Sequence, residues 1–448
     1  MGAPRKGTSA RHHLDEHLEE LERLADTAGA VVVGSITQQI DRPNPATYLG
    51  KGKIEELGAL IAEMDASLVI FDDELTPAQG KNVEEATGKR VMDRAELILD
   101  IFATRARTSE AKMQVELAQL EYMLPRLTRM WTHLEKFRGG IGMRGPGETQ
   151  LETDRRLISH RIKLLKERLV DVTRGREVQR QGRKGTFRAS LVGYTNAGKS
   201  SILRGLSGSQ DVFVEDRLFA TLDPLTREVD LGENNHVLLT DTVGFIRKLP
   251  HHLVASFRAT LEEVRDADLL LHVIDASHPQ WEDQRHVVNG VLEELDVHAK
   301  PVLHLFNKID RVEQGTLLPL EERITNLLPN SVFVSAASEG GLEPLRRALL
   351  VKTRALRPLS EIRLGAGEGR LLAEIHRLGE VIEQRTDGAD LVLRARVDDA
   401  LAGRLRRAGA QVDAGTSTNG SNGVPRDLHD GDDSGASGSV SDRLVDLP

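Results

Sequence analysis

Cysteine does not occur in this chain of 448 residues. Without thiols the chain cannot form disulfides, thiolate zinc sites or a catalytic cysteine, and this favours a reducing compartment. Long apolar runs are also missing: the strongest segments, such as residues 269–274, have strand length, whereas about 20 apolar residues cross a bilayer. The basic residues 1–13 lead into an acidic amphipathic stretch and not into the apolar core of a signal peptide. We expect a cytoplasmic protein with no membrane span.

The chain has a modest acidic excess, with 60 Lys and Arg against 69 Asp and Glu and a formal charge of −9. Taken alone, this charge argues against a protein that covers itself with nucleic acid. The distribution is uneven, because residues 124–189 contain 17 Lys and Arg and 7 Asp and Glu, a difference of +10. A basic element is therefore set in an acidic body.

The first part of the chain, residues 1–107, alternates helical and strand patterns. We expect a helix over 14–29, a strand over the valine-rich residues 30–36, a helix over 53–65 and a strand over 67–73, with Gly and Pro between them. This order predicts a small N-terminal α/β domain. The whole length corresponds to roughly two to four domains.

Residues 108–180 follow a different rhythm, with apolar residues every three or four positions over 113–134 and again over 158–172. This spacing predicts two long helices that pack antiparallel, with the glycine-rich residues 139–147 at the tip. Pro125 interrupts the first helix and is expected to kink it.

Residues 187–355 alternate apolar strands with helical segments, which is typical of a doubly wound, mostly parallel α/β sheet. The strands are expected over 189–194, 235–242, 269–276, 301–308 and 331–337. Residues 360–410 form a short α/β pattern that predicts a small C-terminal domain. Residues 415–448 are rich in Gly, Ser and Asp, so we expect a disordered acidic tail.

A full G-x-x-x-x-G-K-S motif follows the first of these strands, from Gly193 to Ser200. Its glycines let the backbone N–H groups surround phosphate oxygens at the positive end of the next helix. Lys199 is expected to reach the β and γ phosphates, and the Ser200 hydroxyl to bind Mg²⁺. The alternative is a chance glycine turn between a strand and a helix.

Two further blocks fit the phosphate side of such a site. Asp241 ends a strand and can hold the Mg²⁺ water shell, and the N–H of Gly244 can approach the γ phosphate. Upstream, Thr221 lies in a polar segment where a switch loop would place a hydroxyl on Mg²⁺. An ordinary loop threonine remains the alternative for Thr221, since that motif is short.

The remaining two blocks select the base. Asp310, in Asn307-Lys-Ile-Asp310, is acceptor-only when ionised, so it matches the two donors of guanine and faces a lone pair in adenine. Ser335-Ala-Ala337 supplies small residues whose backbone N–H groups can approach the base oxygen. Five blocks in order, each at a strand end, predict a protein that binds and hydrolyses GTP.

The predicted catalytic residues are Lys199, Thr221 and Gly244, and Mg²⁺ is the predicted cofactor, held by Ser200 and Thr221 directly and by Asp241 through water. The predicted GTP-binding residues are those of the five blocks: Gly193, Tyr194, Thr195, Asn196, Ala197, Gly198, Lys199, Ser200, Phe219, Ala220, Thr221, Leu222, Asp223, Asp241, Thr242, Val243, Gly244, Asn307, Lys308, Ile309, Asp310, Ser335, Ala336 and Ala337.

Phe245 directly follows Gly244, at the place where Ras-like GTPases carry the glutamine that orients the attacking water. A phenyl ring has no donor or acceptor for this task. We therefore expect slow hydrolysis by the isolated protein, with the missing group supplied when a partner docks at residues 245–250 and the amphipathic helix that follows.

The chain resembles the HflX family of ribosome-associated GTPases within the translation-factor class. The resemblance rests on YLGKGKIEEL (48–57), residues 91–127, GGIGMRGPGETQLETDRRLI (139–158) and FATLDP (219–224). It implies a GTPase that binds the large ribosomal subunit and splits stalled or idle ribosomes under stress, with the tip of the helix pair reaching into ribosomal RNA.

Four arginines at or beside that tip are the predicted RNA contacts: Arg138, Arg144, Arg155 and Arg156. They are also compatible with a merely solvated helix face. A second reading of the whole chain is a GTP-dependent binding module for another RNA or for a membrane protein, with hydrolysis as a timer. Lys51 in GKGK is a possible further phosphate contact, but the spacing is not that of a P-loop and favours a structural turn. We expect a monomer.

Overall fold

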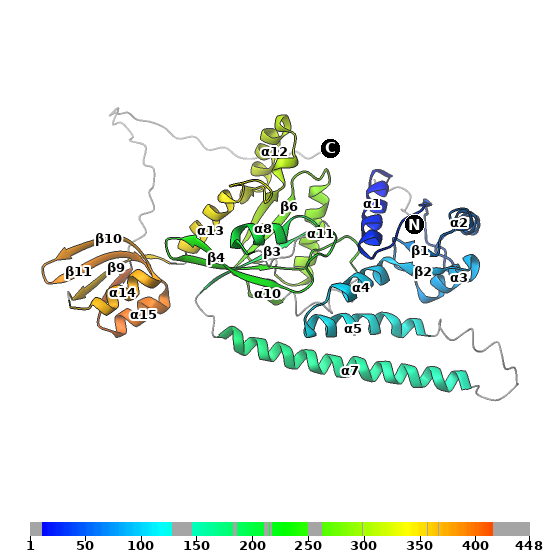
Figure 1. The fold of residues 1–448 in the computed structure, drawn as a ribbon, viewed down its shortest axis with the longest axis horizontal. Coiled ribbons are helices and arrows are strands. Elements are labelled where there is room, and N and C mark those ends of the chain that lie inside the picture. Colours follow the sequence, from blue (N-terminus) through cyan, green and yellow to red (C-terminus); the bar gives the residue numbers. More distant parts are fainter. Residues whose placement is uncertain are drawn as a thin grey trace, which may run out of the picture.

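The computed structural model describes residues 11–127, 146–181, 186–209, 215, 217–249, 262–297, 299–355, 357–365 and 367–414. Figure 1 shows an N-terminal part, a long helix beneath it, a central sheet with helices on both sides, and a small C-terminal part. Arg138, Arg144, most of the expected tip and the tail 415–448 lie outside the described residues.

The N-terminal domain contains α1 (Arg11–Thr27), α2 (Lys51–Glu63), α3 (Pro77–Thr87) and α4 (Arg94–Arg105) around two parallel strands, β1 (Leu68–Phe71) and β2 (Arg90–Asp93). Helix α3 begins at a capping box, in which Thr76 and Gln79 satisfy each other's backbone N–H groups. Asp93 ends β2 and caps α4 by accepting a hydrogen bond from the N–H of Glu96. The expected α/β domain is therefore present.

The strand expected over 30–36 is not formed. Residues 31–36 follow α1 outside any strand, and Val31 is 86% exposed. A cavity of about 680 Å³ separates this segment from β1, which pairs only with β2 among the described residues. The valines have the side chains that strands favour, but a strand also needs a partner for its backbone groups, and no strand of the described residues pairs with this segment.

The helix pair consists of α5 (Ser109–Met123) and α7 (Pro146–Gln181), which lie side by side (Figure 1). Pro125 stands in a 3₁₀ turn, η1 (Leu124–Arg126), where the α-helical pattern of α5 ends. Ion pairs join the two helices, from Arg161 to Glu116 at 2.6 Å and from Lys166 to Glu121 at 2.8 Å.

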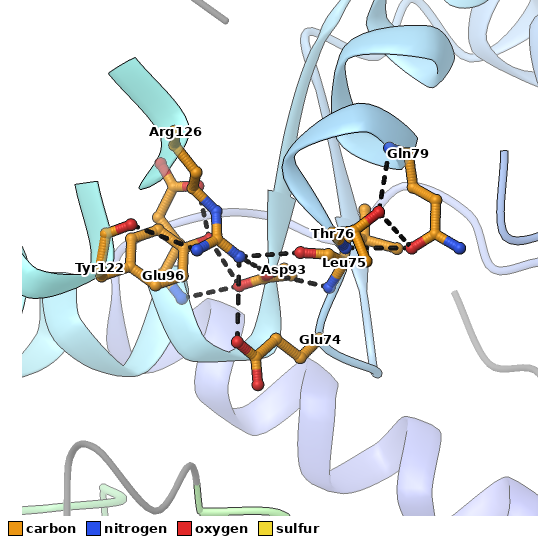
Figure 2. Close-up of polar contacts among 8 residues, drawn as sticks. All are labelled: Glu74, Leu75, Thr76, Gln79, Asp93, Glu96, Tyr122 and Arg126. Carbon is orange, nitrogen blue, oxygen red and sulfur yellow. Dashed lines mark hydrogen bonds and ion pairs between the residues drawn. The ribbon is translucent and has the colours of Figure 1, made fainter. Parts of the chain in front are cut away.

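A polar cluster around the buried Asp93 holds the C-terminal end of α5 against the N-terminal domain (Figure 2). Its centre is Asp93, which accepts hydrogen bonds from the Tyr122 hydroxyl at 2.9 Å and from the N–H of Leu75 at 3.0 Å. Arg126 donates to the same carboxylate at 3.2 Å and covers the Tyr122 ring, 3.5 Å from its centroid. Burial raises the pKa of Tyr122, so its hydroxyl remains a donor.

The central domain is a six-stranded sheet of order β4-β5-β3-β6-β7-β8, in which only β4 runs antiparallel. The expected doubly wound, mostly parallel sheet is confirmed. Its strands are β3 (Phe187–Gly193), β4 (Leu225–Gly232), β5 (Asn235–Asp241), β6 (Leu269–Asp275), β7 (Val302–Asn307) and β8 (Ser331–Phe333). The helices are α8 (Lys199–Ser207), α10 (Glu262–Asp266), α11 (Trp281–Glu294), α12 (Gln314–Leu327) and α13 (Glu343–Ala355), with the 3₁₀ turn η2 (Ile309–Arg311) after β7.

The two faces of this sheet belong to different cores. One face packs on α8 and α13 through residues such as Leu191, Ile202 and Leu349. The other packs on α11 and continues without a break into the N-terminal domain, where Ile98 and Phe102 of α4 belong to the same cluster. The N-terminal and central domains therefore share apolar contacts and are not joined by a linker alone.

The C-terminal domain is a four-stranded antiparallel sheet of order β10-β11-β9-β12 with two helices. Its elements are β9 (Leu359–Gly365), α14 (Gly369–Leu378), β10 (Glu380–Asp387), β11 (Asp390–Arg396), α15 (Asp399–Arg407) and β12 (Gln411–Ala414). This βαββαβ order is that of a split βαβ, or ferredoxin-like, unit.

Among the helices of the described residues, none combines the length and the apolar character that crossing a membrane would require.

Candidate nucleotide-binding site

The loop between β3 and α8 has the backbone that a phosphate-binding loop requires. Gly198 has φ 97° and caps α8, and a Cβ there would lie 2.2 Å from Asn307 Nδ2. Gly193 has φ 154°, and a Cβ there would lie 2.3 Å from the carbonyl oxygen of Val273. Only glycine fits either position, which explains why the motif fixes these two residues.

Lys199 is folded back over this loop. Its ammonium donates to the carbonyl oxygens of Tyr194 at 2.8 Å and of Gly193 at 3.2 Å. Burial lowers the pKa of Lys199 to about 8; the carboxylate of Asp241 opposes this shift, and the charge of Lys308 adds to it. An anionic phosphate at this point would restore the charge balance that the buried ammonium lacks.

Three oxygen atoms from distant segments meet at the start of α8. Ser200 Oγ donates to Asp241 Oδ2 at 2.6 Å and lies 2.8 Å from Thr221 Oγ1. Asp241 is fully buried, which raises the pKa of its carboxyl against the opposing effect of Lys199. Its Oδ1 atom has no hydrogen-bond partner among the described residues. Hard oxygen donors and a buried carboxylate with an unused oxygen fit a small divalent cation.

The segment after Asp241 is joined to the phosphate-binding loop by backbone hydrogen bonds. The N–H of Thr195 donates to the carbonyl of Phe245 at 2.8 Å, and the N–H of Phe245 to that of Gly193 at 3.1 Å. The Phe245 side chain is 1% exposed and lies in the core shared with the N-terminal domain. Gly244 passes so close that a Cβ would lie 2.8 Å from Thr195 Cα.

The base side of the site is organised by Asn307, at the end of β7. Its amide donates to the carbonyl of Ala197 at 2.9 Å and accepts from the N–H of Ala336 at 3.1 Å, so it links two of the five blocks. Asp310 Oδ1 accepts from the Ser335 hydroxyl at 2.5 Å, and the Asp310 side chain is exposed. A carboxylate oriented by a neighbouring hydroxyl at an exposed edge can accept hydrogen bonds from a base.

Family models match three consecutive parts of the chain. They are described as GTP-binding GTPase N-terminal for residues 15–103, GTP-binding GTPase Middle Region for residues 105–183, and 50S ribosome-binding GTPase for residues 188–308.

Two curated relatives, both named GTPase HflX, are similar over most of their length. The protein of Flavobacterium psychrophilum is 53% identical over 77% of this chain and 87% of its own. That of Escherichia coli is 46% identical over 81% of this chain and 85% of its own. The chain belongs to the HflX family of GTPases. It is therefore an enzyme, a P-loop protein that binds GTP and hydrolyses it.

A GTP-binding protein from the hyperthermophilic archaeon Sulfolobus solfataricus, solved in complex with GDP, is 25% identical, with a TM-score of 0.41 over 79% of this chain and 99% of that one.

The five residues predicted as the switch block of this HflX-family GTPase do not share one environment. The Thr221 hydroxyl lies 2.8 Å from Ser200 Oγ, whereas Phe219 and Leu222 are both 2% exposed and belong to the core. Asp223 faces the start of α5 and not the phosphate-binding loop. Glu215 and Arg217, upstream of the motif and missed by sequence reasoning, border the same cavity as Lys199.

Other residues that sequence reasoning missed act between the blocks. Asp275, at the end of β6, forms an ion pair with Lys308 at 2.7 Å. Lys308 has φ 64°, a left-handed conformation that non-glycine residues rarely adopt. Asp275 and Asn307 are register partners in β6 and β7, so this contact follows from strand pairing, which no local motif reports.

The N-terminal domain also contacts the nucleotide loops. Glu20 of α1 binds both Arg94 and the hydroxyl of Tyr194, and that hydroxyl accepts from the N–H of Arg247 at 3.0 Å. Lys248 reaches Asp72 at 2.5 Å. The segment predicted as a docking place for a partner is thus in contact with the N-terminal domain up to Leu249, while residues 250–261 lie outside the described residues.

Proposed function

We propose that this GTPase associates with the large ribosomal subunit and splits or rescues stalled or idle ribosomes under stress. The observation that carries the proposal is the exposed basic surface of α7. Arg155 and Arg156 are exposed there and make no ion pair with any described residue. Over its 36 residues the helix extends for about 54 Å, long enough to carry charge far from the central domain.

Two other basic side chains of α7 differ from Arg155 and Arg156 in their contacts. Arg161 and Lys166 form ion pairs with glutamates of α5, so their positive charge is partly neutralised within the helix pair. Arg155 and Arg156 have no such partner among the described residues, and their exposed guanidinium groups can bind phosphate groups. The description of the model that matches the central domain, 50S ribosome-binding GTPase, supports the same partner.

The proposal includes Mg²⁺ as the cofactor of GTP hydrolysis. Ser200 and Thr221 would hold the ion directly, and Asp241 through water. When bound, the ion would neutralise charge on the β and γ phosphates. Lys199 would face the same oxygens, and Gly244 would present its N–H group. Asp310 would read the guanine base, with Asn307 fixing the distance between the base and the phosphate-binding loop.

Hydrolysis in this proposal depends on the partner. Phe245 is buried among apolar side chains, so it offers the attacking water no polar group. GTPases without a supplied group hydrolyse GTP at about 10⁻⁴ to 10⁻³ per second. We expect single-turnover hydrolysis to rise at least about tenfold on adding large subunits. Thr221→Ala should abolish the rise, because it removes the switch hydroxyl.

Co-sedimentation tests the association. The wild-type protein should pellet with large subunits in the presence of a non-hydrolysable GTP analogue, and less so as salt increases, because phosphate contacts release counterions. Arg155→Glu with Arg156→Glu should remove binding and keep GTP affinity. Arg347→Glu with Lys352→Glu, which changes the same charge on exposed positions of α13, is the matched control. Equal binding by both double variants, or no dependence on salt, would refute the RNA role of α7.

A further inference from the structure

The segment around Thr221 is fixed to the N-terminal domain upstream of the threonine. Glu215 forms an ion pair with Arg105, at the end of α4, at 2.7 Å. The ring of Phe219 packs edge to face on Phe102 of the same helix, with centroids 4.7 Å apart. Phe219 also has φ 54°, so packing holds its backbone in a conformation that it would not adopt alone.

Downstream of Thr221, Asp223 binds the start of α5. Its Oδ2 atom accepts from the N–H groups of Arg107 at 2.9 Å and of Thr108 at 3.3 Å, and its Oδ1 atom accepts from the Thr108 hydroxyl. Thr108 caps α5, since its oxygen accepts from the N–H of Ala111 at 3.1 Å. A carboxylate is stabilised at this end of a helix by the exposed N–H groups and the helix dipole.

Thr221 stands between these contacts. Phe219 and Leu222, on either side of it, are buried in the core shared with the N-terminal domain, while the Thr221 hydroxyl lies 2.8 Å from Ser200 Oγ. A metal-binding group must be held within about 0.5 Å of its productive position to contribute fully. Contacts on both sides of Thr221 therefore restrain its backbone, through Phe219 and Glu215 before it and through Asp223 after it.

We propose that Asp223 is a positioning residue for GTP hydrolysis. By binding the N-terminus of α5, it holds the Thr221 hydroxyl beside Ser200, where the metal ion would bind. Asp223 thus acts through Thr108 and Thr221 and does not touch the nucleotide. The inference rests on the proposed metal role of Thr221. Asp223, the aspartate of FATLDP, therefore forms a contact between two domains, whereas its place in the motif suggests a contact with the nucleotide.

The test compares single-turnover GTP hydrolysis in Mg²⁺ with the affinity for GDP. Asp223→Ala should slow hydrolysis at least about tenfold while GDP affinity stays within about threefold, because only the switch hydroxyl is displaced. Thr108→Val should slow hydrolysis to the same extent, whereas Thr108→Ser, which keeps the hydroxyl, should hydrolyse GTP at the wild-type rate. The Asp223→Ala/Thr108→Val double variant should be no slower than either single variant.

The control is Asp398→Ala, which removes a cap of the same kind from α15 in the C-terminal domain. It should hydrolyse GTP at the wild-type rate, and an equal loss would show that losing a helix cap suffices. Additive effects in the double variant, or a large loss of GDP affinity in Asp223→Ala, would overturn the inference by indicating direct contact with the nucleotide.

Thr221→Ala separates this inference from the function on which it rests. If Thr221→Ala hydrolyses GTP at the wild-type rate, the metal role of the threonine fails and the positioning role fails with it. If Thr221→Ala is slow and Asp223→Ala is not, only the positioning role of Asp223 fails.

Discussion

Gly198→Ala should weaken nucleotide binding through one identifiable contact. The new Cβ would lie 2.2 Å from Asn307 Nδ2, closer than any real contact, and φ 97° is a conformation that alanine avoids. The left-handed backbone costs about 1 to 2 kcal/mol. Moving the Asn307 amide away from Ala197 removes a hydrogen bond, which adds about 1 kcal/mol.

These free-energy costs apply mainly to the protein with nucleotide bound. The free protein can relax the loop or rotate Asn307, whereas a bound nucleotide requires the phosphate-binding loop and the base-reading segment in one arrangement. A total of about 2 to 3 kcal/mol corresponds to a loss of affinity of about 30- to 150-fold. The loss should be similar for GDP and for a non-hydrolysable GTP analogue, because Asn307 links the loop to the base side.

Gly208→Ala is the matched control, since Gly208 ends α8 with φ 65° and a Cβ there would meet no atom within 4 Å. It carries a comparable backbone strain without the collision. Titration with fluorescent GDP should find its affinity within about threefold of the wild type, and thermal unfolding should show that both variants fold. Normal affinity in Gly198→Ala, or an equal loss in Gly208→Ala, would refute the reasoning.

Three further changes have distinct expected results. Lys199→Ala or Ser200→Ala should abolish tight GTP binding in a nucleotide titration, because each removes a group expected on phosphate or metal; wild-type affinity in both would remove them from the site. Asp310→Asn should weaken GTP and improve xanthosine triphosphate, whose extra carbonyl the amide can meet, and a retained guanine preference would show that Asp310 does not read the base. Asp93→Ala should lower the free energy of unfolding by about 3 kcal/mol or more, since the N–H groups of Leu75 and Glu96 and the Tyr122 hydroxyl lose their acceptor at about 1 kcal/mol or more each, while Tyr122→Phe should cost only about 1 kcal/mol; equal losses in chemical denaturation would contradict the central place of Asp93.

Sequence alone predicted the fold of the nucleotide-binding domain and the segments that lie at its candidate site. The phosphate-binding loop and the base-reading block are short strings whose geometry is set by the strand before them and the turn or helix after them. Gly193 and Asn307 could therefore be placed at the ends of β3 and β7 from pattern alone. The alternation of apolar strands and helices likewise predicted the doubly wound sheet, because that pattern reports which faces are buried.

Tertiary structure decided the contacts between segments far apart in the chain. Asp223 stands in the same motif as Thr221, yet its side chain lies on α5, because packing of Phe219 and Leu222 directs the two polar residues to opposite partners. The valines of 30–36 favour a strand, but no strand in the part of the chain that the structure describes pairs with them. Local sequence patterns indicate secondary-structure propensity and the periodicity of buried residues. The direction of a side chain and the pairing of a strand depend on which distant segments lie nearby, and these are brought together only in the folded chain.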